Sequence, residues 1–238
     1  MALARCLSVV AVLVMSTAWA PWADFDAAYE AFNRGDYQVA LKQWRILAAR
    51  GHAGAQFNVG LMYMNGTGVQ QNYTQALHWY RMAAQHGEPH AQNNLGRMYS
   101  SGQGVSQDYT EAVHWYRLAA NQGNGTAQTN LGTLYLNGRG ILRDDKEAMR
   151  WFRRAAEQGE PLAQIKLAMM YHEGEGVTPD YVQAYKWYSI AALNGEKDAV
   201  GLRDLLAEKM THEQMARGYA LARDWDTRRA KQLLALTR

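Results

Sequence analysis

The chain has 238 residues, with 25 Lys and Arg against 22 Asp and Glu, and a formal net charge of +3. Four of the basic residues lie in the last eleven positions, so the rest of the chain carries nearly equal numbers of both charges. That balance lacks the concentrated positive charge of nucleic-acid-binding proteins, and we expect no nucleic-acid partner.

The first twenty residues have the layout of a secretory signal peptide. Arg5 precedes an apolar run, and small residues follow at Ser16, Ala18 and Ala20, which places the cut after 18 or after 20. The alternative is a retained membrane anchor, but the run is shorter than the roughly 20 apolar residues that a span needs. Cys6, the only cysteine, lies inside this segment. We therefore expect a periplasmic or secreted protein without thiols and without stable membrane insertion of the mature chain.

A 36-residue repeat follows. Five units align without a gap, and they begin at Tyr37, Tyr73, Tyr109, Asp145 and Tyr181. Alanine recurs at 40, 76, 112, 148 and 184, glycine at 51, 87, 123, 159 and 195, and tyrosine at 63, 99, 135 and 171. Such recurrence predicts stacked copies of one structural unit over residues 37–210.

Each unit is predicted to contain two helices. In the second unit, apolar residues at helical spacing mark a first helix over roughly 73–86, which Asn72 caps and Gly87 ends. The second helix covers about 89–101 and begins at Pro89. Glycines inside the second helices, at 60, 96 and 132, predict close approach of a neighbouring backbone.

A connector with two glycines joins successive units. Gly102 is expected to end the second helix, and Gly104 allows another sharp turn. The apolar residue that follows is predicted to pack beneath the loop, and it occurs as Val69, Val105, Ile141 and Val177.

The fifth unit departs from the pattern after Ala199, where the repeated Leu, Gly, Tyr and two further Gly are replaced by Arg203, Asp204, Ala207, Met210 and His212. Residues 211–238 are predicted to form a C-terminal capping helix with a basic tail, starting at a capping box of Thr211 and Gln214. For the last twelve residues, extension of the helix, fraying and contact with a partner all stay open.

The stretch "AVHWYRLAANQGNGTAQTNLGTLYLNGRGI" resembles Sel1-like repeats, which are relatives of tetratricopeptide repeats with a longer connector. The resemblance covers residues 37 to about 200. It implies an all-α, right-handed solenoid of antiparallel helical hairpins. Residues 21–36 resemble the second helix of a tetratricopeptide unit, which implies an N-terminal capping half-repeat.

No pattern of catalytic residues is found, and we expect neither an enzyme nor a cofactor nor a metal site. His86 and His90 are four residues apart, but Gly87 and Pro89 break a shared helix face. Some Sel1-like proteins were described as β-lactamases. This chain lacks both their cysteines and a Ser-x-x-Lys motif, so the resemblance does not carry that activity over.

Three ladders of residues recur along the repeats. The tryptophans Trp79, Trp115, Trp151 and Trp187 lie inside the apolar stripe and are expected to pack between hairpins, with ligand stacking as the alternative. Basic residues share one face of the first helices. They are Lys42, Arg45, His78, Arg81, His114, Arg117, Arg150, Arg153 and Lys186. Asparagines at Asn58, Asn94 and Asn130 form the third ladder, for which partner binding and hydrogen bonds to a neighbouring repeat both stay open.

In the resembled folds the first helices line a concave groove. The hypothesis is therefore an interaction module whose groove binds a protein or peptide partner, with the basic face favouring acidic groups. A solvated basic face is the alternative reading of that ladder. A polysaccharide-binding protein or enzyme of the cell envelope, and a secreted factor that engages host proteins, are the alternative functions. The sequence leaves the oligomeric state open.

Overall fold

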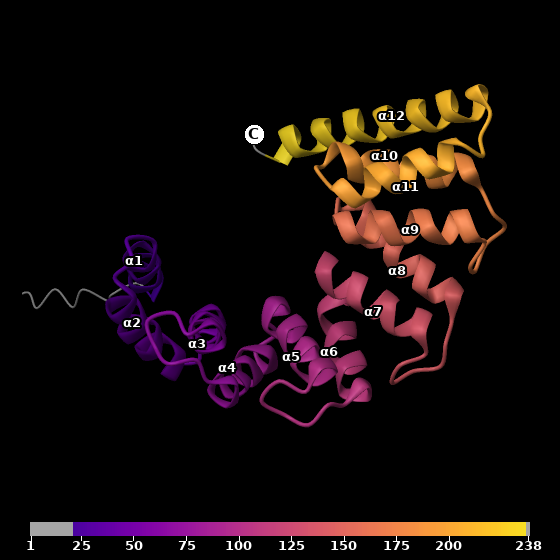
Figure 1. Ribbon diagram of the computed structural model, residues 1–238. Coiled ribbons are helices and arrows are strands. Elements are labelled where there is room, and N and C mark those ends of the chain that lie inside the picture. The colour runs from indigo at the N-terminus through magenta and orange to yellow at the C-terminus, as the bar shows by residue number, and fades with distance from the viewer. Residues whose placement is uncertain (1–20, 237–238) are drawn as a thin grey trace, which may run out of the picture.

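The computed structural model describes residues 21–236, which form twelve α-helices and no strand. The predicted signal segment lies outside these residues. Figure 1 shows the helices stacked in a curved array that runs from α1 to α12. Their bounds are α1 Pro21–Asn33, α2 Tyr37–Ala49, α3 Ala53–Asn65, α4 Tyr73–Gln85, α5 Pro89–Ser101, α6 Tyr109–Asn121, α7 Gly125–Asn137, α8 Asp145–Glu157, α9 Pro161–Glu173, α10 Tyr181–Leu193, α11 Lys197–Ala207 and α12 His212–Leu236.

The predicted hairpins are present, with α2, α4, α6, α8 and α10 as first helices and α3, α5, α7, α9 and α11 as second helices. The predicted caps hold from the second unit onward, where the side chains of Asn72, Asp108, Asp144 and Asp180 accept hydrogen bonds from N–H groups of the first turn. Asp36 makes no such bond at the start of α2.

The connectors pack as the sequence predicted. Val69, Val105, Ile141 and Val177 each lie against the apolar core of a hairpin. Gly104 has a φ of +72°, and a Cβ built on it would lie 2.8 Å from the carbonyl carbon of Tyr73. The second glycine is required because the loop passes directly over the start of the preceding first helix.

The contacts between units include aromatic rings packed against helix glycines. A Cβ on Gly96 would lie 2.5 Å from the Cδ1 atom of Tyr116 in the next unit, and Gly60 meets the Tyr80 ring in the same way. At Gly132 the carbonyl oxygen of Ala148 lies 3.2 Å from such a Cβ, so the expected approach of a neighbouring backbone occurs there, but a ring makes the closest contact at all three glycines. Burial raises the pKa of Tyr80 to about 12 and shifts the pKa of Tyr116 in the same direction, in keeping with the enclosed position of both rings.

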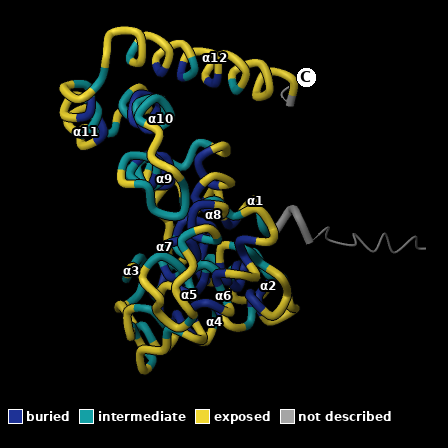
Figure 2. Tube along the Cα trace, turned by 90° about the vertical axis from the view of Figure 1, so that its right-hand side faces the viewer, coloured by how far each residue is buried: buried dark blue, intermediate teal, exposed yellow. Residues whose placement is uncertain are grey.

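Figure 2 shows the buried residues concentrated where helices stack, while α12 is largely exposed on its outer side. The regular stack ends with the fifth unit, which contains α10 and α11. Asp204 occupies the place that Gly60, Gly96, Gly132 and Ala168 hold in the earlier second helices, and it is exposed. In the described part of the chain α11 is followed by α12, which packs against α10. At the contact between α12 and α10, the Tyr185 ring packs against Gly218, where a side chain would leave no room for it.

Replacing Gly96 with Ala is expected to lower the free energy of unfolding by about 1–3 kcal/mol, because the methyl group collides with the buried Tyr116 ring. Gly201 is the matched control, since it is helical and has open space around its missing Cβ. Gly201→Ala should raise stability by up to about 1 kcal/mol through helix propensity. Urea denaturation followed by circular dichroism measures both. A stabilising Gly96→Ala would contradict this packing argument.

Candidate functional site: the basic stripe and the C-terminal helix

The basic residues of the first helices lie in the order that the sequence predicted. This set, called the basic stripe below, contains Lys42 and Arg45 on α2, His78 and Arg81 on α4, His114 and Arg117 on α6, Arg150 and Arg153 on α8, and Lys186 on α10. All of them are exposed except Lys186, which is partly buried.

Hydrogen bonds orient three arginines of the stripe. The guanidinium groups donate to tyrosine hydroxyls on the second helix of the same hairpin, over 2.6 Å for Arg81–Tyr99, 3.2 Å for Arg117–Tyr135 and 2.8 Å for Arg153–Tyr171. One hydrogen bond leaves most of the five N–H donors of each guanidinium available. The repeated tyrosine thus presents the arginines in one orientation.

Four further residues of the stripe, on α4, α6, α8 and α10, lie beside the tryptophan ladder. His78 and His114 contact Trp79 and Trp115 edge to face, at 5.4 and 5.1 Å between ring centroids. The Lys186 ammonium lies 4.0 Å from the Trp187 centroid. The tryptophans pack against the core of the preceding hairpin, as expected. The stripe therefore also covers part of the inter-unit core.

Ion pairing within the stripe is sparse. Among residues 25–235, the salt bridges include one member of the stripe, Arg150, whose Nη1 lies 3.3 Å from Glu147. Burial lowers the pKa of Lys186, while the charge of Glu157 acts in the opposite direction. The positive charge of the stripe is thus largely unneutralised by carboxylates of the described chain.

One asparagine of the predicted ladder forms a hydrogen bond to a neighbouring repeat. Asn130 donates to the Oδ1 atom of Asn93 in the preceding unit over 3.1 Å. Asn58 and Asn94 are half-buried as well. Partner binding by this ladder stays a prediction.

Sequence reasoning missed a buried glutamine ladder. Gln56, Gln92, Gln128 and Gln164 each donate through Nε2 to the carbonyl oxygen of a first-helix alanine, at 48, 84, 120 and 156, over 3.0–3.2 Å. Their Oε1 atoms bond to the side chains of His86, Gln122, Gln158 and Asn194 in the next unit. The recurrence of glutamine beside the alanine column was a signal that could have revealed this network.

The helix α12 covers the C-terminal end of the stripe. Trp225 is only 4% exposed, and its Nε1 donates to Glu157 of α8 over 2.7 Å. The Trp225 ring meets Trp187 at 6.0 Å, edge to face. Arg229 donates to the carbonyl oxygen of Gln158 over 2.8 Å. The tail thus extends the predicted capping helix, and this helix lies across the faces of α8 and α10.

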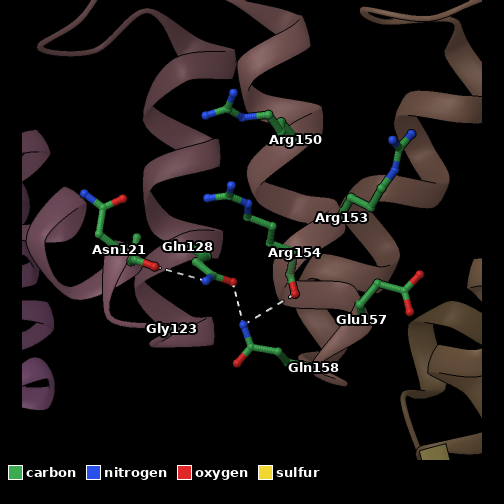
Figure 3. A pocket seen from close by; sticks show the side chains of 9 residues that line it. Asn121, Gly123, Gln128, Arg150, Arg153, Arg154, Glu157 and Gln158 are labelled. Carbon is green, nitrogen blue, oxygen red and sulfur yellow. Dashed lines mark hydrogen bonds between the residues drawn. The ribbon is translucent and has the colours of Figure 1, made fainter.

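A pocket of about 590 Å³ lies between the end of α6 and α8 (Figure 3), and two residues of its lining, Glu157 and Gln158, accept hydrogen bonds from α12. Its lining includes Asn121 and Gly123 from one side and Arg150 and Arg154 from the other. The side chains of Arg150 and Arg154 extend in the same direction, while Arg153 points the opposite way, so the prediction that Arg150 and Arg153 face the same side was wrong on α8. Arg154, which the sequence analysis did not select, lies 4.9 Å from the Trp151 ring centroid.

Residues 25–235 contain no group of three or more His, Cys, Asp or Glu side chains that could hold a metal ion. None of the described helices is both long enough and apolar enough to cross a membrane.

The sequence of the chain matches the family of the Sel1 repeat over four consecutive stretches, residues 53–88, 89–124, 125–160 and 161–196. Together these stretches make up more than half of the chain. The chain belongs to the Sel1 repeat family. Its fold is the predicted right-handed all-α solenoid, and Sel1 repeats generally form scaffolds for protein–protein interaction that are typically non-enzymatic.

Solved structures are similar to this Sel1 repeat protein. A protective antigen of uropathogenic Escherichia coli strains, c5321, shares 34% identity at a TM-score of 0.80 over 87% of this chain, but only 45% of that chain is covered. A Sel1 repeat protein from Oxalobacter formigenes shares 30% identity, with a TM-score of 0.74 and 85% of each chain covered. A comparison with curated proteins gives no match.

Replacing Trp225 with Ala should detach α12 from the Sel1 repeats, because a large buried side chain and its hydrogen bond to Glu157 are lost together. The expected cost is about 3–5 kcal/mol of local stability. Hydrogen–deuterium exchange over residues 212–236 measures it as faster exchange. Tyr219→Ala, on the exposed side of α12, is the control and should leave exchange nearly unchanged. Equal exchange in both variants would contradict the anchoring role of Trp225.

Proposed function

We propose that this protein is an exported interaction module whose basic stripe binds an acidic segment of a partner protein. The observation that carries the proposal is the ladder of exposed arginines held by tyrosine hydroxyls on three successive hairpins. The first helices that bear the stripe would form the inner wall of the groove. No catalytic step is proposed, in line with the typical role of Sel1 repeats.

The arginines would recognise carboxylates through paired N–H···O hydrogen bonds. Arginine suits this task because its planar fork matches the two carboxylate oxygens. Holding the side chain beforehand lowers the entropy that binding would otherwise cost. Regular spacing of the arginines along the stack favours an elongated partner segment over a compact one.

Apolar residues beside the stripe add a second requirement. Ile46 on α2 and Leu118 on α6 are 47% and 38% exposed, and they occupy equivalent places in their units. A pocket of about 470 Å³ on α2 is lined by Ile46, Leu41, Lys42 and Arg45, among others. The best-fitting partner segment therefore carries apolar residues toward α2 and acidic ones along the whole stripe.

Replacing Arg81, Arg117 and Arg153 with Glu together should abolish recovery of acidic protein partners in a cross-linking pull-down from the envelope fraction. At each of the three positions, the new Glu side chain would repel the acidic groups of the partner. A variant with Glu at Arg50, Arg217 and Arg223, which are exposed and outside the stripe, carries the same change in net charge. Circular dichroism verifies that both variants fold. If both recover the same partners as the unaltered protein, the stripe does not bind them.

Export is the second element of the proposal, and it rests on the signal-like residues 1–20. Fractionation of the producing bacterium should find the chain in the periplasm, with a mass that corresponds to a new N-terminus at Trp19 or Pro21. Deleting residues 2–20 should retain it in the cytoplasm. A full-length, cytoplasmic product from the unaltered gene would overturn this part.

A secreted factor that engages host proteins is the second candidate function. The similarity to a structure described as a protective antigen of uropathogenic strains favours it. The same fractionation separates the candidates, because a secreted factor would accumulate in the culture medium and an envelope scaffold would not.

A further inference from the structure

The pocket between α6 and α8 occupies the place, one unit earlier, at which α12 docks. The helix α12 docks against Glu157, Gly159 and Trp187. The equivalent positions one unit earlier, 36 residues before, are Asn121, Gly123 and Trp151. Asn121 and Gly123 line the pocket, and Arg150 and Arg154 lie over the Trp151 ring. One surface feature therefore occurs twice, filled by a helix of this chain in one unit and open in the unit before it.

The open copy has a different charge from the filled one. The neutral Asn121 of the open copy occupies the position that the hydrogen-bond acceptor Glu157 has in the filled copy. Likewise, the exposed Arg154 occupies the position of the buried Ile190. Glu157 also borders the pocket, but its carboxylate is bonded to Trp225. In the filled copy the surface offers a carboxylate to α12. In the open copy it offers guanidinium groups.

We propose that this pocket receives an acidic α-helix of a partner protein, which lies alongside α12 and places a carboxylate between Arg150 and Arg154. The proposal rests on the proposed function and specifies the partner's conformation and charge at one point of the stripe. Three observations carry it: the docked α12 shows that this surface accepts a helix, the pocket is continuous with the α12 interface at Gln158, and its arginines extend together from α8 (Figure 3).

Charge complementarity decides against a second copy of this chain as the occupant. In α12, five Arg and Lys residues stand against three Asp and Glu residues, with Arg228 and Arg229 close to Trp225 in the sequence. A second α12 would bring these arginines toward Arg150 and Arg154. A helix with carboxylates in their place would meet complementary charge.

The test uses two synthetic peptides and the full mature chain. One peptide has the sequence of residues 212–236, and the other differs by Arg228→Glu and Arg229→Glu. Isothermal titration calorimetry at low ionic strength should show that the acidic peptide binds at least ten-fold more tightly. Hydrogen–deuterium exchange should show protection in residues 120–128 and 150–158, with α12 remaining protected.

Two variants of the protein locate the binding. Arg154→Glu should weaken binding of the acidic peptide at least ten-fold, because it reverses the charge at the pocket wall. Arg217→Glu makes the same change at an exposed position of α12 and should leave the affinity within two-fold. The proposal is overturned if the two peptides bind equally, if neither binds, if Arg154→Glu has no effect, or if α12 loses protection.

The pull-down described above separates this proposal from the proposed function. If the triple variant of the stripe loses its partners while Arg154→Glu retains them, the stripe binds partners and the pocket does not receive the helix. If neither change affects recovery, the proposed function itself fails.

Discussion

An aromatic ring placed against a helix glycine holds neighbouring hairpins together. Tyr80 and Tyr116 approach Gly60 and Gly96 so closely that no side chain fits between them, and Phe152 meets Gly132 in the same manner. Glycine in the interior of a helix costs about 1 kcal/mol relative to alanine, so the packing that it permits must offset that cost. The angle and spacing of the stack follow from this contact, and so does the regular spacing of everything displayed on it.

A buried polar network fixes the register of that stack. Apolar contacts alone tolerate some sliding, whereas each glutamine of the ladder must meet a carbonyl group on one side and a side chain of the next unit on the other. In the fifth unit Val200 replaces the glutamine, and Asp204 stands where the earlier units have a glycine or Ala168. The solenoid therefore ends where both inter-unit contacts stop.

The display surface is a consequence of the same periodicity. On α4, α6 and α8, one basic residue lies against a tryptophan of the same helix, and a second one is held by a tyrosine of the same hairpin. These contacts give the stripe a structural role as well as an orientation suited to binding. At the C-terminal end, α12 uses part of this surface, which shows within one molecule that a helix can lie across the first helices of the array. The protein thus combines a regular scaffold with one occupied docking place.

The sequence by itself determined the helices, their caps, the connectors and the family, because each depends on local signals that recur every 36 residues. It also identified the residues of the basic stripe, since their spacing on a helix is fixed. It did not reveal that a ring fills the glycine gap or that Arg81 bonds to Tyr99, because both depend on side-chain directions across a packed interface. The sequence also did not predict where α12 lies on the stack. The course of that helix is set by the contact of Trp225 with Glu157 and Trp187, which are 68 and 38 residues away in the chain, and only the folded stack brings them together.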